Sequence, residues 1–337
     1  MKIIIPMAGM GKRMRPHTLS IPKPLIPIAG KPIVYRLVED IAKVCGQAVE
    51  EVAFIIHRSF GEKVEKNLIA VAEALGAKGS IYYQEEALGT AHAIMCAKNS
   101  LEGNVVVAFA DTLFKADFTL DTSKDGIIWV QKIEDPRQFG VVKLNEKQEI
   151  IEFVEKPQHF VSDLAIIGIY YFKEGAYLRK HLQYLLDNEI KDKGEYQLTN
   201  ALENMKNEGT KFSTGEVTEW LDCGNKDATV YTNQRYLAFL EERKENLLPK
   251  SARLYNTLII EPVFIGEDVS IENTVLGPYV SVGQGSQIKN SVIKNTIIQE
   301  KTSLENLHLE NSMIGNFVEW RGKTQNVSVG DYNTFFE

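Results

Sequence analysis

The 337-residue chain is predicted to form a doubly wound α/β domain with a mostly parallel sheet, followed by a parallel β-helix. Two observations carry this prediction. In the first half, short apolar segments alternate with amphipathic ones, which is the order of strands and helices in βαβ units. After Pro249, aliphatic residues recur at every fifth or sixth position, which is typical of short stacked strands. We place the first domain at residues 1–245 and the second at residues 250–337.

The elements of the first domain follow from apolar runs and from the residues that start and stop helices. In the first predicted helix Pro32 lies early and Gly46 follows its end, as helix termini favour. Strands are predicted at Lys2–Pro6, Val52–Ile56, Ile81–Gln84, Asn104–Ala110, Gly126–Lys132, Gly140–Leu144, Glu149–Val154, Ile166–Phe172 and Lys211–Val217. Helices are predicted at Pro32–Cys45, Phe60–Leu75, Gly89–Lys98, Glu174–Asp187, Tyr196–Asn207 and Asn225–Lys244.

The second domain is predicted from one repeated position. A short strand cannot bury its inward side chain alone, so successive coils of the chain must stack. The predicted inward residues are Ile265, Ile271, Leu276, Val282, Ile288, Ile293, Ile298, Leu304, Leu309 and Ile314. An ordinary β-meander is the alternative, because Gly-containing hexads are sparse after Gly283.

Composition narrows the class of protein. The net charge of −7 argues against a broad nucleic-acid-binding surface, so a phosphate ligand would need a local cationic pocket. The three cysteines lie far apart and form no CxxC pair, which argues against a disulfide scaffold or a zinc site. No window reaches the ~20 apolar residues of a membrane span. We therefore expect a cytoplasmic protein that binds no membrane.

A glycine-containing loop follows the first predicted strand. The segment AGMGKRMRP begins at Ala8, and Gly9 and Gly11 allow backbone N–H groups to approach an anion closely. Arg13 and two neighbouring cations add positive charge, and Lys23 follows between two prolines. The loop matches neither Walker A nor G-x-G-x-x-G. These residues favour a triphosphate site, the alternative being a surface loop with solvated charges.

The segment from Ala8 to Tyr35, AGMGKRMRPHTLSIPKPLIPIAGKPIVY, resembles the signature of sugar nucleotidyltransferases. That signature reads A-G-G-x-G-T-R-L-x-P-x-T, then K-P-L-L-P and a second K-P segment. Here the loop is one residue shorter than in glucose-1-phosphate thymidylyltransferases, and Lys12 replaces the usual Thr. The resemblance implies a left-handed β-helix, as in long-form members, and assigns nucleotide binding to Ala8, Gly9 and Gly11. It further implies that Arg13 binds the triphosphate and Lys23 the α-phosphate.

The segment YQEEALGTAHA resembles the part of the family that recognises the nucleobase. A glutamine amide can donate to a base carbonyl and accept from an imide N–H. Uracil and thymine present that edge, and guanine presents a similar one. The resemblance thus assigns base recognition to Gln84 and the backbone of Gly89. His92, in the same segment, is expected to pack within a helix rather than act as a base.

Two aspartates are the candidate metal ligands. Asp111 closes an apolar strand, and the carboxyl ends of strands in a doubly wound sheet face the ligand crevice. Asp222, in WLDCG, resembles the family's second metal carboxylate. Mg²⁺ prefers one or two carboxylates together with phosphate oxygens, so this pair would suffice. Either residue alone could instead be a helix N-cap.

The sugar phosphate is assigned by resemblance to two further segments. Gly140, with Glu155 and Lys156 in EKP, matches the family's sugar-phosphate segment, and GEYQLT adds Glu195. Glu155 would accept from sugar hydroxyls, and Lys156 would bind the phosphate. Without the resemblance, Glu155 and Lys156 are a solvated pair before a proline.

The resemblance implies a sugar-1-phosphate nucleotidylyltransferase that uses Mg²⁺. Its partners would be a nucleoside triphosphate, either dTTP or UTP, and a hexose 1-phosphate. Glucose 1-phosphate is the first candidate for the hexose 1-phosphate. Two alternatives stay open: a catalytically silent regulatory or scaffold homologue, and a bifunctional enzyme with an acyltransferase β-helix, in which only His308 could serve as the catalytic histidine. We expect a homo-oligomer.

Overall fold

The computed structural model describes residues 1–116, 119–326, 328–329 and 332. Tertiary contacts divide the chain into two units. The first contains Met1–Ile26 and Lys31–Ala228, and the second contains Pro27–Gly30 and Thr229–Glu337. Residues 327, 330–331 and 333–337 of the predicted second domain lie outside the described residues. The predicted boundaries, 1–245 and 250–337, remain a prediction.

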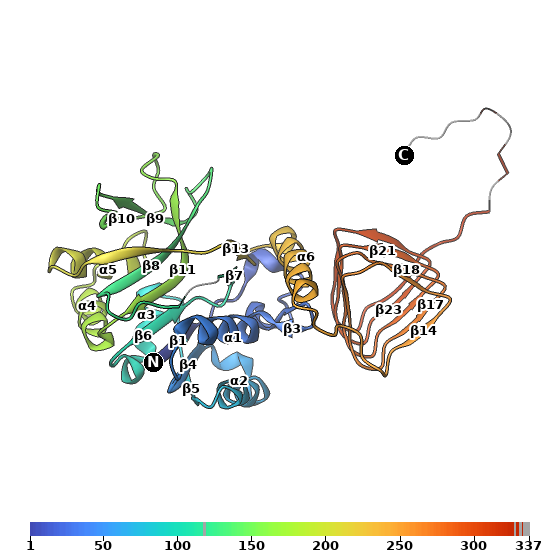
Figure 1. The fold of residues 1–337 in the computed structure, drawn as a ribbon, viewed down its shortest axis with the longest axis horizontal. Helices are drawn as coiled ribbons and strands as arrows, with labels where there is room; N and C mark the ends of the chain where they lie inside the picture. The colour runs from blue at the N-terminus through green and yellow to red at the C-terminus, as the bar shows by residue number, and fades with distance from the viewer. Residues whose placement is uncertain (117–118, 327, 330–331, 333–337) are drawn as a thin grey trace. The chain divides into compact units, whose positions relative to one another are not determined.

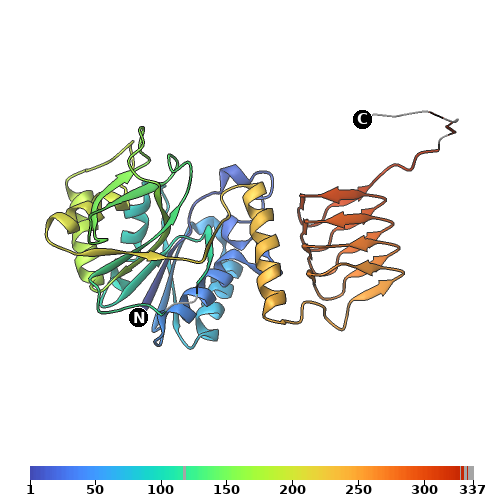
Figure 2. The same cartoon turned by 45° about the horizontal axis from the view of Figure 1, so that its top comes forward.

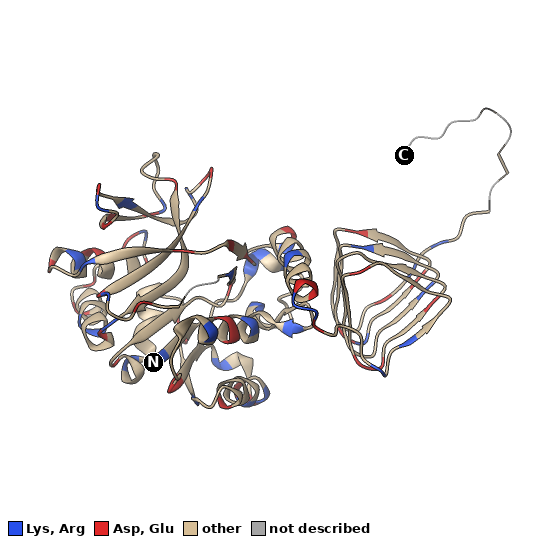
Figure 3. Ribbon diagram, in the orientation of Figure 1, with Lys and Arg blue, Asp and Glu red and all other residues tan. Residues whose placement is uncertain are grey.

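Four parallel strands form the centre of the first unit, in the order β6-β1-β4-β5 (Figure 1). They are β1 (Lys2–Pro6), β4 (Glu51–Ile56), β5 (Lys78–Tyr83) and β6 (Val105–Ala108). Strands β4 and β6 are buried along their whole length, as expected for strands covered on both faces. Figure 3 shows charged residues mainly on the helices and loops around this sheet.

Two groups of helices cover the sheet. Helices α1 (Ile33–Cys45) and α2 (Glu62–Ala74) contact each other, and α3 (Thr90–Cys96) packs against α4 (Gly175–Asp187) and α5 (Leu198–Asn207). Short 3₁₀ turns are η1 (Lys12–Met14), η2 (Lys23–Leu25), η3 (Arg58–Phe60) and η4 (Lys98–Ser100). The two groups confirm the doubly wound arrangement.

Antiparallel pairing extends the sheet to nine strands among the described residues. The added strands are β8 (Gly126–Lys132), β9 (Gly140–Leu144), β10 (Ile150–Glu155), β11 (Leu164–Phe172) and β12 (Phe212–Glu216). Strand β11 runs antiparallel to β6, β8 and β9, whereas β12 is parallel to β8. The sheet is therefore mixed, with its parallel part next to the glycine loop that follows β1.

Four short strands were not predicted from sequence. Strand β7 (Thr112–Lys115) pairs with β13 (Glu219–Asp222), and β2 (Pro27–Ile28) and β3 (Lys31–Pro32) have two residues each. All four strands are too short for a periodic pattern to be visible. Asp111 thus lies between β6 and β7 rather than at the end of a longer strand, because β6 ends at Ala108.

The second unit contains α6 (Lys226–Glu242) from Thr229 onward, and a parallel β-helix whose coils stack in rungs (Figure 2). Its strands form three parallel sheets. One contains β14 (Arg253–Tyr255), β17 (Ser270–Glu272), β20 (Gln287–Lys289), β23 (Ser303–Glu305) and β26 (Glu319–Arg321). The others contain β15 (Leu258–Ile259), β18 (Val275–Leu276), β21 (Val292–Lys294) and β24 (His308–Glu310), and β16 (Val263–Ile265), β19 (Val280–Val282), β22 (Ile297–Ile298) and β25 (Met313–Ile314).

All ten predicted inward residues lie in the hydrophobic core of this β-helix. Its three parallel sheets are consistent with the left-handed β-helix that the resemblance implies, and they exclude the β-meander. The coils turn at asparagines with positive φ, including Asn273 and Asn290, whose side chains are hydrogen-bonded to each other. Asparagine tolerates this conformation, so these corners need no glycine, and this explains why Gly-containing hexads are sparse.

Candidate active site

The glycine loop after β1 packs directly on Lys23. Gly11 has φ +56°, and a Cβ atom there would lie 2.8 Å from the Cβ atom of Lys23. The hydroxyl of Thr18 donates to the carbonyl oxygen of Gly11 at 2.8 Å. Around Gly9, by contrast, an added Cβ would meet nothing within 4 Å. The loop therefore has one tightly packed glycine and one that borders open space, where a phosphate could approach the backbone.

A cation and two carboxylates meet beside this loop. The ammonium group of Lys23 lies 3.0 Å from Oδ2 of Asp111. The Lys23 side chain is 9% exposed, whereas that of Asp111 is 44% exposed and open to a ligand. The β7–β13 ribbon pairs Asp222 with Thr112, and the Cys223 N–H donates to the Asp111 carbonyl at 2.9 Å. The ribbon thus brings the two predicted metal ligands together.

The charge state of Asp222 reflects this proximity. Burial, and then repulsion from the Asp111 carboxylate, raise the pKa of Asp222 above its ordinary 3.8. Lys23 and Arg13 act in the opposite direction, as does the Gly224 N–H, which donates to Oδ1 at 2.9 Å. Two carboxylates that repel each other at a partly exposed site suit a divalent cation with phosphate ligands. The residues therefore fit Mg²⁺, although no group of three or more His, Cys, Asp or Glu ligands occurs among the described residues.

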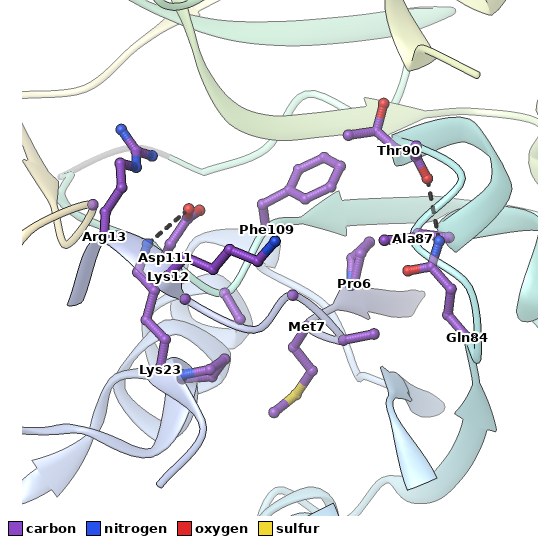
Figure 4. Close-up of a pocket in the computed structure, with 18 of the residues that line it drawn as sticks. Pro6, Met7, Lys12, Arg13, Lys23, Gln84, Ala87, Thr90, Phe109 and Asp111 are labelled. Atoms are coloured by element: carbon purple, nitrogen blue, oxygen red, sulfur yellow. Dashed lines mark hydrogen bonds and ion pairs between the residues drawn. The ribbon is translucent and has the colours of Figure 1, made fainter. Parts of the chain in front are cut away.

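The glycine loop, Lys23 and Asp111 line a pocket of about 410 Å³. Figure 4 shows Lys23, Asp111 and Arg13 at one end and Gln84 at the other, with Pro6, Met7 and Phe109 between them. Nine predicted site residues line it: Ala8, Gly9, Gly11, Arg13, Lys23, Gln84, Gly89, Asp111 and Glu195. The pocket thus has polar side chains at both ends, with apolar side chains and the Lys12 ammonium group between them.

At the far end, Gln84 is held by two neighbours. It is only 8% exposed, and its Nε2 lies 3.3 Å from the Gly89 carbonyl and 3.1 Å from Nδ1 of His92. Both amide hydrogens are therefore engaged within the protein. This differs from the expectation that Gln84 both donates to a base and accepts from it, because in this conformation it can only accept.

The sugar-phosphate residues form a second cluster. Gly140 and Glu155 are register partners in β9 and β10, and the hydroxyl of Thr199 donates to Glu155 at 3.3 Å. The ammonium group of Lys156 lies 3.5 Å from Glu155. Gly140, Glu155 and Lys156 do not line the pocket described above, and neither does Asp222.

Three observations describe the surroundings of this cluster and of Glu195. Gln197 accepts from Thr90, which lines the pocket, and donates to Glu195 at 3.1 Å. Next to Gly140, the ring of Phe139 packs edge-on against Trp220 of β13, with centroids 5.1 Å apart. Burial, and then the charges of Glu155 and Asp111, raise the pKa of Tyr170. Tyr170 therefore senses the charges of both Glu155 and Asp111.

Sequence reasoning assigned no role to several lining residues. Lys12 was counted only as nearby charge, yet it lines the pocket, is exposed, and forms no ion pair among the described residues. Its position in the glycine loop was the available signal. Thr90 and Phe109 also line the pocket, but nothing in the sequence around them indicates that they face a ligand.

Among the described residues, no helix combines the length and apolar composition of a membrane span.

A doubly wound sheet with a glycine loop, clustered cations and paired carboxylates defines the class of phosphate-binding α/β proteins. Comparison with known proteins is more specific. The family model for nucleotidyl transferases matches residues 2–238, and the chain belongs to this family.

Two relatives and one solved structure illustrate the similarity. The chain is 30% identical over 318 residues to the bifunctional protein GlmU of Methanococcus vannielii, covering 87% of this chain and 73% of that protein. It is 27% identical over 312 residues to a glucose-1-phosphate thymidylyltransferase of Streptomyces antibioticus, covering 86% and 85%. A UDP-glucose pyrophosphorylase crystallised with UDP-glucose matches with a TM-score of 0.58 at 22% identity, over 71% of this chain and 98% of that one. The last match shows a shared fold.

Proposed function

We propose that the chain transfers a nucleoside monophosphate from dTTP or UTP to a hexose 1-phosphate and releases pyrophosphate. Glucose 1-phosphate is the first candidate for the hexose 1-phosphate. The observation that carries this proposal is that one pocket has Lys23, Arg13 and Asp111 at one end and Gln84 at the other. Such a pocket suits a ligand with a phosphate chain at one end and a nucleobase at the other. The UDP-glucose bound to the similar structure has the same two parts.

The proposed reaction is an in-line displacement. An oxygen of the sugar 1-phosphate attacks the α-phosphorus, the bond to the β-phosphate oxygen breaks, and pyrophosphate leaves with the electron pair. The attacking phosphate is ionised at neutral pH, so the step needs no general base. Its barrier comes from repulsion between anions and from charge on the phosphate oxygens, which preorganised cations offset. A bound Mg²⁺ would neutralise part of that charge, and Asp111 and Asp222 are the residues that would hold it.

Each predicted residue has a role in this proposal. The backbone at Ala8, Gly9 and Gly11 binds the triphosphate with Arg13, and Lys23 holds the α-phosphate. Gln84 and Gly89 bind the base. The residues that bind the sugar phosphate are Gly140, Glu155, Lys156 and Glu195.

The experiment that tests this function is a matrix of nucleoside triphosphates against sugar 1-phosphates, scored by pyrophosphate release with Mg²⁺. We expect release only when UTP or dTTP is combined with a hexose 1-phosphate. Lys23→Ala should lower turnover by about 10²–10³ while the protein stays folded. A folded wild-type protein that releases no pyrophosphate with any pair would instead support the regulatory or scaffold alternative.

The bifunctional alternative is favoured by one observation, the name of the Methanococcus vannielii relative. In this chain His308 is exposed on β24, where its register partner is Val292. Incubation with acetyl-coenzyme A and an amino-sugar phosphate tests the alternative, and we expect no acetyl transfer. We also propose that the chain forms a homo-oligomer, which sedimentation of the purified protein would measure.

A further inference from the structure

The side-chain amide of Gln84 has one orientation that its surroundings allow. Its nitrogen lies 3.3 Å from the carbonyl oxygen of Gly89, and a backbone carbonyl can only accept a hydrogen bond. If the amide were rotated by half a turn, two oxygens would face each other in a buried position. The nitrogen must therefore face Gly89, and the oxygen, Oε1, must face away from it. Figure 4 shows this oxygen turned toward Pro6 and Met7, into the pocket.

His92 holds the second hydrogen of the same nitrogen. Its Nδ1 lies 3.1 Å from Nε2 of Gln84, which can only donate, so Nδ1 must carry no proton. This fixes the neutral ring with its proton on Nε2. Burial lowers the pKa of His92 below its ordinary 6.5, and the Glu86 carboxylate, the charged group that acts on the ring among the described residues, opposes this shift. The neutral ring is therefore the form that the protein favours near neutral pH.

Among the described residues, Oε1 of Gln84 accepts no hydrogen bond within the protein. A nearly buried acceptor that borders a pocket needs a donor from the ligand, because an unpaired polar group loses the free energy of its hydrogen bond to water. Uracil and thymine offer such a donor at N3–H. Cytosine and adenine present a lone pair at the equivalent ring nitrogen, which would repel Oε1.

We propose that His92 is a positioning residue for base selection, which locks the Gln84 amide so that its oxygen selects bases with an imide N–H. This inference rests on the proposed function, and it explains why the protein would bind UTP or dTTP in preference to CTP or ATP. Base selection would depend on the two hydrogen bonds that Nε2 of Gln84 donates, one to the Gly89 carbonyl and one to the neutral imidazole of His92. Together they leave the amide one orientation.

The first test uses the wild-type protein, so it depends on no variant. N3-methyl-UTP carries a methyl group in place of the imide hydrogen that Oε1 requires. We expect the methylated nucleotide to raise KM by roughly 10- to 100-fold, the factor that corresponds to an unpaired buried polar group. An unchanged KM would overturn the inference while leaving the proposed function intact. Absence of pyrophosphate release with UTP, dTTP and every sugar 1-phosphate would overturn the proposed function itself.

The second test separates positioning from packing. In His92→Asn the amide oxygen can accept from Gln84 in place of Nδ1, but it cannot be protonated. In His92→Leu the second hydrogen of the Gln84 amide loses its acceptor, and only the Gly89 carbonyl still holds the amide. We expect His92→Asn to keep the wild-type KM for UTP, and His92→Leu to raise it about 10-fold with a smaller change in kcat and weaker discrimination against CTP. The exposed His159→Asn is the matched control and should behave as wild type.

The pH profile is the readout that packing alone would not change. In the wild-type protein, protonation of His92 removes the acceptor, so KM for UTP should rise as pH falls through the pKa of the ring, below about 6.5. His92→Asn should lack this rise. The same acid-side rise in His92→Asn, or a His92→Leu protein with unchanged KM and base preference, would overturn the inference.

Discussion

Lys23 and Asp111 form an ion pair of 3.0 Å although 88 residues separate them in the chain. The lysine is nearly buried and the aspartate is half-exposed, so the pair has one side that water or a ligand can reach. Asp222 lies beside it, and burial, followed by repulsion from the Asp111 carboxylate, raises the pKa of Asp222. The two candidate metal ligands therefore differ electrostatically, and this difference can be measured.

The first prediction compares Asp111→Asn with Asp222→Asn. Asp111→Asn leaves the buried Lys23 ammonium without its partner, which should cost about 1–2 kcal/mol, less than for a fully buried pair because water reaches the site. The pKa of Asp222 is higher in the folded protein than in the unfolded chain. At any pH above the unfolded-state pKa, the ionised carboxylate therefore lowers the stability of the folded protein. Asp222→Asn removes that penalty, so its Tm should stay unchanged or rise. Thermal unfolding at neutral pH without metal measures both.

Both variants should nevertheless lose about 10²–10³ in turnover, because each removes a proposed metal carboxylate. The asparagine at position 222 can still accept from the Gly224 N–H, so the local backbone should be preserved. Near-wild-type pyrophosphate release from a folded Asp222→Asn protein would contradict the metal assignment. A lowered Tm for Asp222→Asn alone would contradict the electrostatic account.

The second prediction concerns pH and Mg²⁺. A metal must displace the proton from Asp222, and the raised pKa of this carboxyl means that protons compete at a higher pH than for an ordinary aspartate. The Mg²⁺ concentration for half-maximal activity should therefore rise as pH is lowered from neutrality. Initial rates across a Mg²⁺ series at each pH measure this, with saturating substrates. A half-maximal concentration that stays constant until the protein unfolds would show that Asp222 holds no metal.

The third prediction uses two glycines of one loop. At Gly11 an alanine would meet Lys23 and would also have to adopt a left-handed φ, so Gly11→Ala should lower Tm and weaken triphosphate binding. At Gly9 an added Cβ meets nothing within the protein, so Gly9→Ala should leave Tm unchanged. If phosphates approach the Gly9 backbone, Gly9→Ala should still raise KM for the triphosphate. Equal KM values for Gly9→Ala and the wild type would mean that phosphates do not approach this backbone.

The fourth prediction concerns Lys12, which replaces the threonine typical of the family. Its exposed ammonium group lines the pocket and has no carboxylate partner among the described residues. Lys12→Thr should therefore raise KM for the triphosphate about fivefold, the effect of losing roughly 1 kcal/mol of partly screened attraction. The effect should shrink at high ionic strength. The exposed Lys66 of α2 provides the control, since Lys66→Thr should leave KM unchanged.

The β-helix and the glycine loop could be predicted because each depends on a pattern that is local in sequence. Inward aliphatic residues must recur once per short strand, so residues such as Ile288 and Ile293 were placed in the core by spacing alone. The pairing of Gly140–Leu144 with the next strand was visible for the same reason, and it sets Gly140 opposite Glu155.

The rest of the site depends on contacts between distant segments. No spacing rule joins Asp111 to Asp222. The four-residue strands that bring them together, β7 and β13, are held by tertiary pairing rather than by a periodic pattern. Likewise, Gln84 and His92 were both visible in the sequence, but their hydrogen bond needs the loop between them to fold back on the first turn of α3. The resemblance to a family supplied the first relationship, and only the structure supplied the second.

The phosphates of the triphosphate report most directly on which bond the protein breaks. UTP labelled in the α-phosphate and UTP labelled in the γ-phosphate are incubated separately with the wild-type protein, Mg²⁺ and glucose 1-phosphate. Attack at the α-phosphorus predicts that the α-label enters a sugar nucleotide and the γ-label appears in pyrophosphate. Release of the γ-label as inorganic phosphate, or no transfer of the α-label to glucose 1-phosphate, would mean that the protein does not transfer a nucleoside monophosphate to a sugar phosphate.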